Sequence, residues 1–182
     1  MSDFRSGLLY IWQWPGLLTA MILSALLNLL LIPTFALLPI LVTRHFGGDA
    51  LALSALNTLS GVGFVVGGLA LSAWGGFQRR ILTSLLGLAG LGLGVLLVAA
   101  APANAFWLAL VGMAITGIMG PIANGPFFAM LQTVVAPEMQ GRVFTVLMSL
   151  SAAMAPVGLA LAGPIADRLG VRVWYAVGGV AC

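Results

Sequence analysis

Five long apolar runs dominate this sequence of 182 residues and leave few choices for its fold. Hydrophobic residues make up 62% of the chain and charged residues 6%, which is too few charges to cover the surface of a soluble domain. An apolar helix needs about 17–25 residues to cross the hydrocarbon core of a bilayer. The runs therefore predict an all-α membrane protein embedded in the lipid bilayer, with spans at residues 17–42, 51–74, 81–101, 105–135 and 143–165.

The segments around these spans predict the domain organisation. Short linkers at 43–49, 75–80, 101–104 and 136–142 make consecutive spans antiparallel neighbours in one bundle over residues 17–182. A sixth run, 171–182, is too short to cross the membrane, so we expect a partial span that ends inside a helix. Residues 1–16 combine Trp with charged residues and predict a cytoplasmic or interfacial segment.

The sparse charges exclude several classes of function. All seven basic residues are Arg and the net charge is +3, without the cationic cluster that nucleic-acid binding requires. His45 has no further ligands at metal spacing, so we expect neither a metal nor a cofactor. Cys182 is the one cysteine, which rules out an internal disulfide. No activated nucleophile is recognisable, so we expect no enzyme activity.

The interior of the five predicted spans contains no Asp, Glu, Lys, Arg or His. Proton relays and ion pathways in membranes are usually built from ionisable side chains. The chain by itself therefore lacks the obvious machinery for proton coupling.

Uncharged polar and aromatic residues inside the spans are candidates for a substrate cavity. Asn124 is the strongest of them, because Pro121 and Pro126 on either side can open the helix backbone locally. The alternative is that such amides tie helices together, at about 0.6 kcal/mol each on average. The full set of cavity candidates is Asn28, Phe35, Asn57, Asn124, Phe128 and Gln132.

Small residues and prolines form a second pattern. Small residues let helix backbones approach closely, and the same surfaces could slide in a rocking transporter. The residues alone are compatible both with static packing and with sliding contacts. The helix-packing candidates are Gly61, Gly63, Gly67 and Gly68 in the second span and Pro156 and Gly163 in the fifth.

Four stretches together resemble the C-terminal half of a major facilitator superfamily exporter of the macrolide-efflux and enterobactin-exporter type. They are the opening 4–17, the glycine-rich 61–68 with its basic turn, the turn 137–143 and the exit 156–170. The most specific is Pro137-Glu138-Met139-Gln140-Gly141-Arg142-Val143, which is similar to a P-[DE]-x-x-x-G-R-V turn of that family. The residues that carry the two turn motifs are Gly75, Arg79, Arg80, Pro137, Glu138, Gly141 and Arg142.

The resemblance implies half of a twelve-helix fold, with these five spans as helices seven to eleven and helix twelve cut short. It implies a multi-pass protein of the inner (plasma) membrane with a cytoplasmic N-terminus, which agrees with a weak excess of Arg on that side. It further implies efflux of amphipathic drugs, macrolides or siderophores by proton antiport through a missing N-terminal half. One departure is that the turn at 75–80 lacks the acidic residue common in the family.

Two other interpretations stay open. The chain could be a non-transporting membrane interaction or regulatory protein that pairs with a second copy through its glycine-rich face. It could also be a fragment without independent function.

Overall fold

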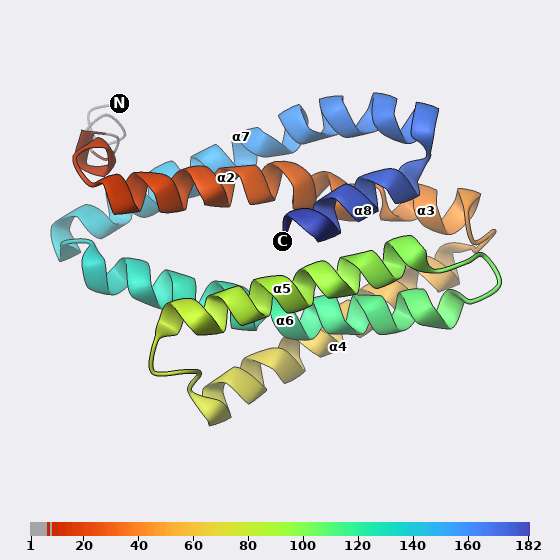
Figure 1. Ribbon diagram of the computed structural model, residues 1–182, viewed down its shortest axis with the longest axis horizontal. Coiled ribbons are helices and arrows are strands. Elements are labelled where there is room, and N and C mark those ends of the chain that lie inside the picture. The colour runs from red at the N-terminus through yellow and green to blue at the C-terminus, as the bar shows by residue number, and fades with distance from the viewer. Residues whose placement is uncertain (1–6, 8) are drawn as a thin grey trace.

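A computed structural model describes Gly7 and residues 9–182. The predicted interfacial segment 1–16 therefore lies partly outside the described residues, which omit 1–6 and Leu8. The described residues contain helices and no β-strand, and consecutive long helices run antiparallel in an elongated bundle (Figure 1). The helices are α2 (Pro15–Ala36), α3 (Leu38–Arg44), α4 (Ala50–Trp74), α5 (Arg80–Ala100), α6 (Phe106–Val134), α7 (Pro137–Leu169) and α8 (Val171–Ala181).

Five of these helices, namely α2, α4, α5, α6 and α7, are long and apolar enough to cross a membrane. The prediction of an all-α membrane bundle with five spans is thereby confirmed. α8 has 11 residues, which correspond to about 16 Å at 1.5 Å per residue. It is therefore too short to cross a hydrocarbon core of about 30 Å.

The first predicted span, 17–42, is divided into two helices. α2 ends at Ala36 and α3 begins at Leu38, with Leu37 between them. Pro39 in the first turn of α3 explains the break, because proline has no N–H to donate to the preceding turn and its ring crowds that turn. The prediction of one continuous helix over residues 17–42 is therefore wrong.

The fifth helix is longer than predicted. Residues 137–142 were expected in a linker, but α7 begins at Pro137 and runs for 33 residues to Leu169. Proline is favoured in the first helical turn, because its missing N–H would have no partner there and its φ already suits a helix. At 1.5 Å per residue α7 is about 50 Å long, so it extends beyond a bilayer core of about 30 Å.

The helices form two groups of three. In the first group, α6 packs extensively against α4 and α5. In the second group, α2, α7 and α8 pack against one another. The contact between α5 and α8 joins the two groups. Two clusters of buried residues also hold the groups together. The cluster at the α3 end includes Leu41, Val98 and Trp174, and the cluster at the opposite end includes Met21, Leu131 and Val143.

Glycine brings the helices of one group into backbone contact. A Cβ on Gly63 would lie 2.7 Å from the carbonyl oxygen of Ala114, and one on Gly94 would lie 2.8 Å from that of Gly112. Side chains larger than hydrogen do not fit at such distances. The G-x-x-x-G pair Gly63 and Gly67 therefore faces α6 and packs α4 against it.

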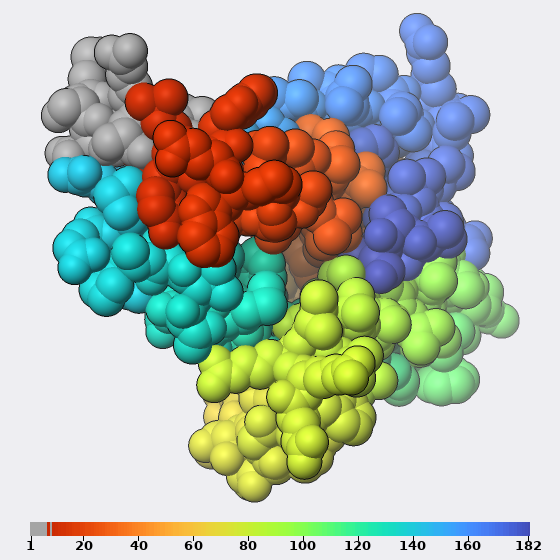
Figure 2. Space-filling view, turned by 60° about the vertical axis from the view of Figure 1, so that its left-hand side comes forward, coloured from red at the N-terminus to blue at the C-terminus, as the bar shows by residue number. Residues whose placement is uncertain are grey.

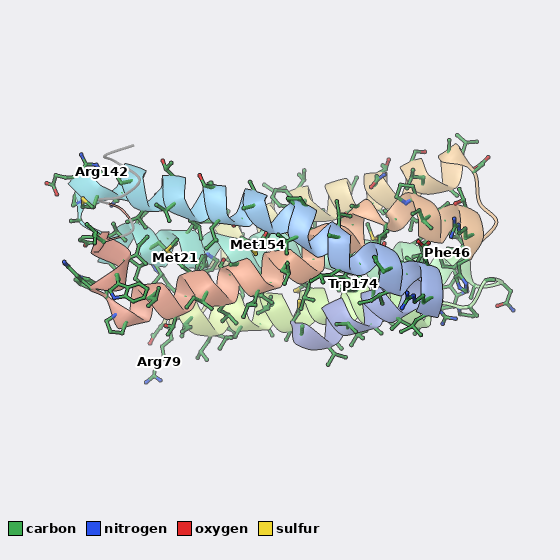
Figure 3. The ribbon with its side chains drawn as sticks, turned by 90° about the horizontal axis from the view of Figure 1, so that it is seen from above. Met21, Phe46, Arg79, Arg142, Met154 and Trp174 are labelled. Atoms are coloured by element: carbon green, nitrogen blue, oxygen red, sulfur yellow. The ribbon has the colours of Figure 1, made fainter. Side chains whose placement is uncertain are left out.

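The bundle has two ends with different loops. Arg79, before α5, and Arg142, in the first turns of α7, lie at the same end, and Phe46 lies at the other (Figure 3). Gly75 closes α4 at the arginine end with φ of 75° and donates its N–H to the carbonyl of Leu71. This left-handed conformation favours glycine, which has no Cβ to clash.

Candidate functional site

A cavity of about 450 Å³ lies between α2, α5 and α6. α2 packs against α7 and α8 rather than broadly against α5 or α6, which leaves this space between the two helix groups. In Figure 2 the hollow is surrounded by α2 in red, α5 in lime and α6 in teal. The lining includes Leu23, Asn28, Leu31, Ser84, Leu88, Leu91, Asn124, Phe127 and Met130.

The wall of the cavity is amphipathic and uncharged. Leucines from α2 and α5 provide most of the apolar surface, with Phe127 and Met130 from α6. No Asp, Glu, Lys, Arg or His lines it. The uncharged polar side chains of the lining are Thr19, Ser24, Asn28, Ser84 and Asn124.

Asn28 and Asn124 are the two predicted cavity residues that line this cavity. Asn28 Nδ2 donates to the carbonyl of Ser24 at 2.8 Å, and Asn124 Nδ2 donates to the carbonyl of Gly120 at 3.0 Å. A carbonyl only accepts, so the amide nitrogen of each Asn must be the atom bonded to the helix. The amide oxygens therefore remain available as hydrogen-bond acceptors.

Ser84 was not among the sequence candidates, although its hydroxyl belongs to the same cavity. Its Oγ is buried and has no hydrogen-bond partner among the described residues. A buried hydroxyl without a partner is unfavourable in an apolar environment. The spacing of Ser84, Leu88 and Leu91 by four and three residues places them on one helix face, a signal that could have been read from the sequence.

The other four cavity candidates lie elsewhere. Phe35 and the exposed Asn57 are absent from the cavity lining. Phe128 packs beside the buried cluster at the arginine end, where its ring lies 6.0 Å from that of Phe144. Gln132 is exposed, and its backbone carbonyl accepts a hydrogen bond from Gln140.

The helix-packing candidates divide between inner and outer faces. Gly63 and Gly67 touch the backbone of α6, whereas Gly61, Gly68 and Gly163 have open space where a Cβ would be. Pro156 is also on an exposed face of α7. The structure thus assigns Gly63 and Gly67 to packing within the bundle and leaves the others on its outer surface.

The two turn motifs serve to end one helix and begin the next. The backbone N–H of Phe77 donates to Thr83 Oγ1 at 2.8 Å, which ties the loop after α4 to α5. Arg79 precedes α5 and Arg80 is its first residue. Both arginine side chains are exposed at this end of the bundle.

At the second turn, Pro137 and Glu138 occupy the first turn of α7. A carboxylate is favourable there, because the N-terminal end of a helix carries partial positive charge. Gln140 Nε2 donates to the carbonyls of Gln132 at 2.8 Å and Val135 at 3.2 Å, which joins α7 to the end of α6. The carbonyl of Gly141 accepts a hydrogen bond from Thr145 Oγ1. Arg142 Nη1 donates to Met139 Sδ at 3.8 Å.

The opposite end of the bundle is held by polar contacts to α5. His45 Nε2 donates to the carbonyl of Ala101 at 2.9 Å, and Arg172 Nε donates to that of Ala99 at 2.7 Å. These carbonyls end α5 and would otherwise lack helical partners. His45 therefore has a structural partner, and the described residues contain no group of three or more His, Cys, Asp or Glu that could hold a metal.

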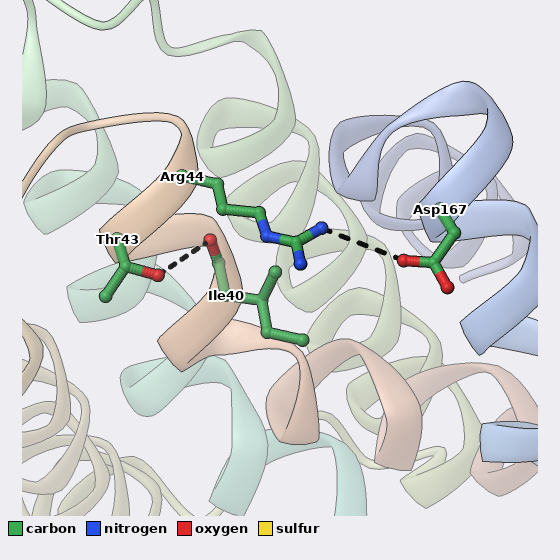
Figure 4. A network of polar contacts seen from close by, with 4 residues as sticks. All are labelled: Ile40, Thr43, Arg44 and Asp167. Carbon is green, nitrogen blue, oxygen red and sulfur yellow. Dashed lines mark hydrogen bonds and ion pairs between the residues drawn. The ribbon is translucent and has the colours of Figure 1, made fainter.

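An exposed ion pair joins α3 and α7 at this same end (Figure 4). Arg44 Nη1 lies 3.7 Å from Asp167 Oδ1, and both side chains are more than two-thirds exposed, at 71% and 76%. Exposed pairs of this kind contribute at most about 1 kcal/mol. The pair therefore adds little to the stability of the bundle.

Comparison with known proteins finds efflux proteins. The chain is 29% identical over 179 residues to macrolide efflux protein A of Streptococcus pyogenes, covering 98% of this chain and 44% of that protein. It is 27% identical over 159 residues to macrolide efflux protein A of Enterococcus faecalis, covering 87% and 49%. It is 30% identical over 179 residues to the multidrug efflux pump Tap of Mycolicibacterium fortuitum, covering 96% and 42%.

The chain spans less than half the length of these curated relatives. No family model matches it, and no solved structure does. Along nearly all of its own length, this bundle of membrane-spanning helices is nevertheless similar to efflux transporters.

Proposed function

We propose that this chain is the C-terminal half of a secondary active efflux transporter that exports amphipathic small molecules. The observation that carries the proposal is its similarity to macrolide and multidrug efflux proteins over 96–98% of its length. Five apolar helices and an uncharged amphipathic cavity support the same function. Macrolides are the first substrates to test, because two of the relatives are named for their efflux.

The cavity suits an apolar molecule that carries hydrogen-bond donors. Its leucine-rich wall can bury apolar surface, and the amide oxygens of Asn28 and Asn124 can accept hydrogen bonds from hydroxyl or protonated amine groups. We propose that these two side chains contact the exported molecule from α2 and α6.

Energy coupling belongs to the part of the transporter that is outside this sequence. The predicted spans contain no ionisable side chain to carry a proton, so we propose that an N-terminal half supplies the coupling carboxylate. We further propose a plasma-membrane location with the N-terminus, Arg79 and Arg142 on the cytoplasmic side. Arginines retained on the cytoplasmic face would favour this orientation.

The test is accumulation of a radiolabelled macrolide in cells that express this chain, an N-terminal half taken from one of the relatives, or both together. Lower accumulation is expected only when both halves are present, and it should be lost when the proton gradient is collapsed. Unchanged accumulation with both halves correctly inserted would overturn the proposal.

Variants then locate the substrate contacts. Asn28→Leu and Asn124→Leu should each raise accumulation towards the level of cells without the transporter. Asn57→Leu is the matched control, because it makes the same change on an exposed face outside the cavity. An equal loss of export in all three variants would show that Asn28 and Asn124 do not act through the cavity. It would not contradict the proposal that the chain takes part in export.

A further inference from the structure

A second cavity, of about 360 Å³, lies where α3 and α7 end and α8 begins. It shares no lining residue with the cavity between α2, α5 and α6. Its charged lining consists of Arg44 at the end of α3, Asp167 in the last turn of α7 and Arg172 in the first turn of α8. With His45 formally neutral, two guanidinium groups against one carboxylate leave an excess of one positive charge (2 − 1 = 1). This excess favours an anionic occupant.

Both guanidinium groups keep hydrogen-bond donors for a further partner. Arg172 Nε donates to the carbonyl of Ala99 at 2.7 Å, which uses one of the five N–H donors of the group and holds it in place. Arg44 Nη1 lies 3.7 Å from Asp167 Oδ1 (Figure 4). A charge-assisted hydrogen bond between nitrogen and oxygen measures about 2.7–2.9 Å. The carboxylate is therefore a loose partner of Arg44, which a closer anion can replace.

The cavity lies at the depth of the lipid headgroups. Asp167 is the first charged residue after Arg142 along α7. The 25 steps between them (167 − 142 = 25) cover about 38 Å of helix, and a bilayer with its headgroup regions is about 40–45 Å thick. When Arg142 lies in one headgroup region, Asp167 and the cavity beside it lie in the other.

Apolar side chains line the cavity on the side nearer the middle of the membrane. Ile40 precedes Arg44 by four residues, so the two side chains share a face of α3 and Ile40 lies one turn deeper. On α7, Ala166 precedes Asp167 and also lines the cavity. The site thus combines cations at headgroup depth with an apolar wall beneath them. A free anion would use only the arginines, whereas a phospholipid would use both parts.

We propose that this cavity binds the phosphate group of a membrane phospholipid. The phosphate accepts hydrogen bonds from Arg44 and Arg172, because the planar guanidinium group matches phosphate oxygens in pairs. The acyl chains descend along Ile40 into the hydrocarbon, and Asp167 competes with the phosphate for Arg44. The site is separate from the cavity assigned to the exported molecule, and the inference does not depend on export.

Lipid binding by the purified chain in detergent micelles, measured by native mass spectrometry, tests the site. The probe is dioleoylphosphatidylglycerol, whose one charge is on its phosphate. Arg44→Gln should raise the apparent Kd about fivefold, the contribution of one basic residue beside an anionic headgroup. Asp167→Asn should lower it by about the same factor, because it removes the competing carboxylate. Arg44 rather than Arg172 is replaced, since Arg172 also holds the end of α5.

Arg168→Gln is the matched control. Arg168 is exposed and adjoins Asp167 in the chain, but it does not line the cavity. Its replacement should change the Kd by less than about twofold. Equal weakening by R44Q and R168Q would show a diffuse attraction of the lipid to this end of the bundle and overturn the proposal. Weakening by both R44Q and D167N would show that only the intact ion pair matters, which also overturns it.

Two further probes separate the sources of binding. Dioleoylglycerol has the same acyl chains without the phosphate and should bind at least fivefold more weakly, about the loss expected for the missing charge. Binding as tight as that of the phospholipid would mean that the chains alone are recognised. An excess of inorganic phosphate should leave the phospholipid bound. Its displacement by inorganic phosphate would show a site for a free anion. Either of these results would overturn the assignment to a phospholipid.

Discussion

Gly67 offers the sharpest test of how α4 is held in the bundle. A Cβ at this position would overlap the backbone carbonyl oxygen of Ile118 and lie 2.8 Å from its Cα and carbonyl carbon. Ordinary contacts of a Cβ begin at 3.4 Å, so α4 and α6 must separate by at least 0.6 Å (3.4 − 2.8 = 0.6) to admit an alanine. Overpacking of this kind costs about 1–3 kcal/mol.

The next residue provides a matched control. Gly68 has nothing within 4 Å of an added Cβ, so Gly68→Ala introduces no clash and gains up to about 1 kcal/mol of helix propensity. For a chain of 182 residues, a loss of about 2 kcal/mol lowers the melting temperature by about 4–8 °C. Gly67→Ala should therefore melt below the wild type, and Gly68→Ala at or above it.

The assay uses the native cysteine as its reporter. Cys182 is half-buried, so a thiol-reactive fluorophore added to the purified protein in micelles becomes bright as the bundle opens on heating. Circular dichroism of the same samples checks that both variants start fully helical. If Gly67→Ala melts at or above the temperature of Gly68→Ala, the close approach of α4 to α6 is not what holds this helix, and the reasoning is refuted.

Three further predictions concern the ends of the bundle. Arg172→Leu should lose about 1.5–3 kcal/mol in the same melting assay, because it removes a hydrogen bond from a charged group to the carbonyl of Ala99. Asp167→Asn should change stability by less than about 1 kcal/mol, because its ion pair is exposed. In intact cells, Arg79→Cys and Arg142→Cys should react with an impermeant maleimide equally, whichever side they occupy, because both lie at one end of the bundle; labelling of one alone would contradict the fold.

Several features of the fold could be predicted because they depend on local sequence. The length and apolarity of the runs are sufficient to predict the number of membrane-spanning helices. This is because backbone N–H and C=O groups in lipid must form their hydrogen bonds within a helix. Proline was harder to interpret. Pro39 breaks the first span, whereas Pro137 begins α7 in what was expected to be a linker. The effect of each proline depends on its place in the hydrogen-bonding pattern of the helix.

The site was predictable only in part. Asn28 and Asn124 line the cavity, but Asn57 and Gln132, which carry the same amide group, are exposed and do not line it. Ser84, which was not among the sequence candidates, lines the cavity from α5. In lipid, polarity alone does not assign a residue to the interior, because an exposed amide can satisfy one of its groups on its own helix.

The sequence by itself determined that the chain lies in a lipid bilayer, how many helices cross it and that these helices carry no charge in their interior. These features depend only on the identity and hydropathy of consecutive residues. The tertiary structure decided which faces meet. Gly63 and Gly67 contact α6 while Gly61 and Gly68 on the same helix do not, and α2 packs on α7 and α8 but leaves a cavity beside α5 and α6. In lipid the hydrophobic effect does not drive helices together, so helix pairing depends on how closely small residues let one helix backbone approach another. The residues that meet in this way are far apart in the chain, so the sequence of one helix does not identify its neighbour.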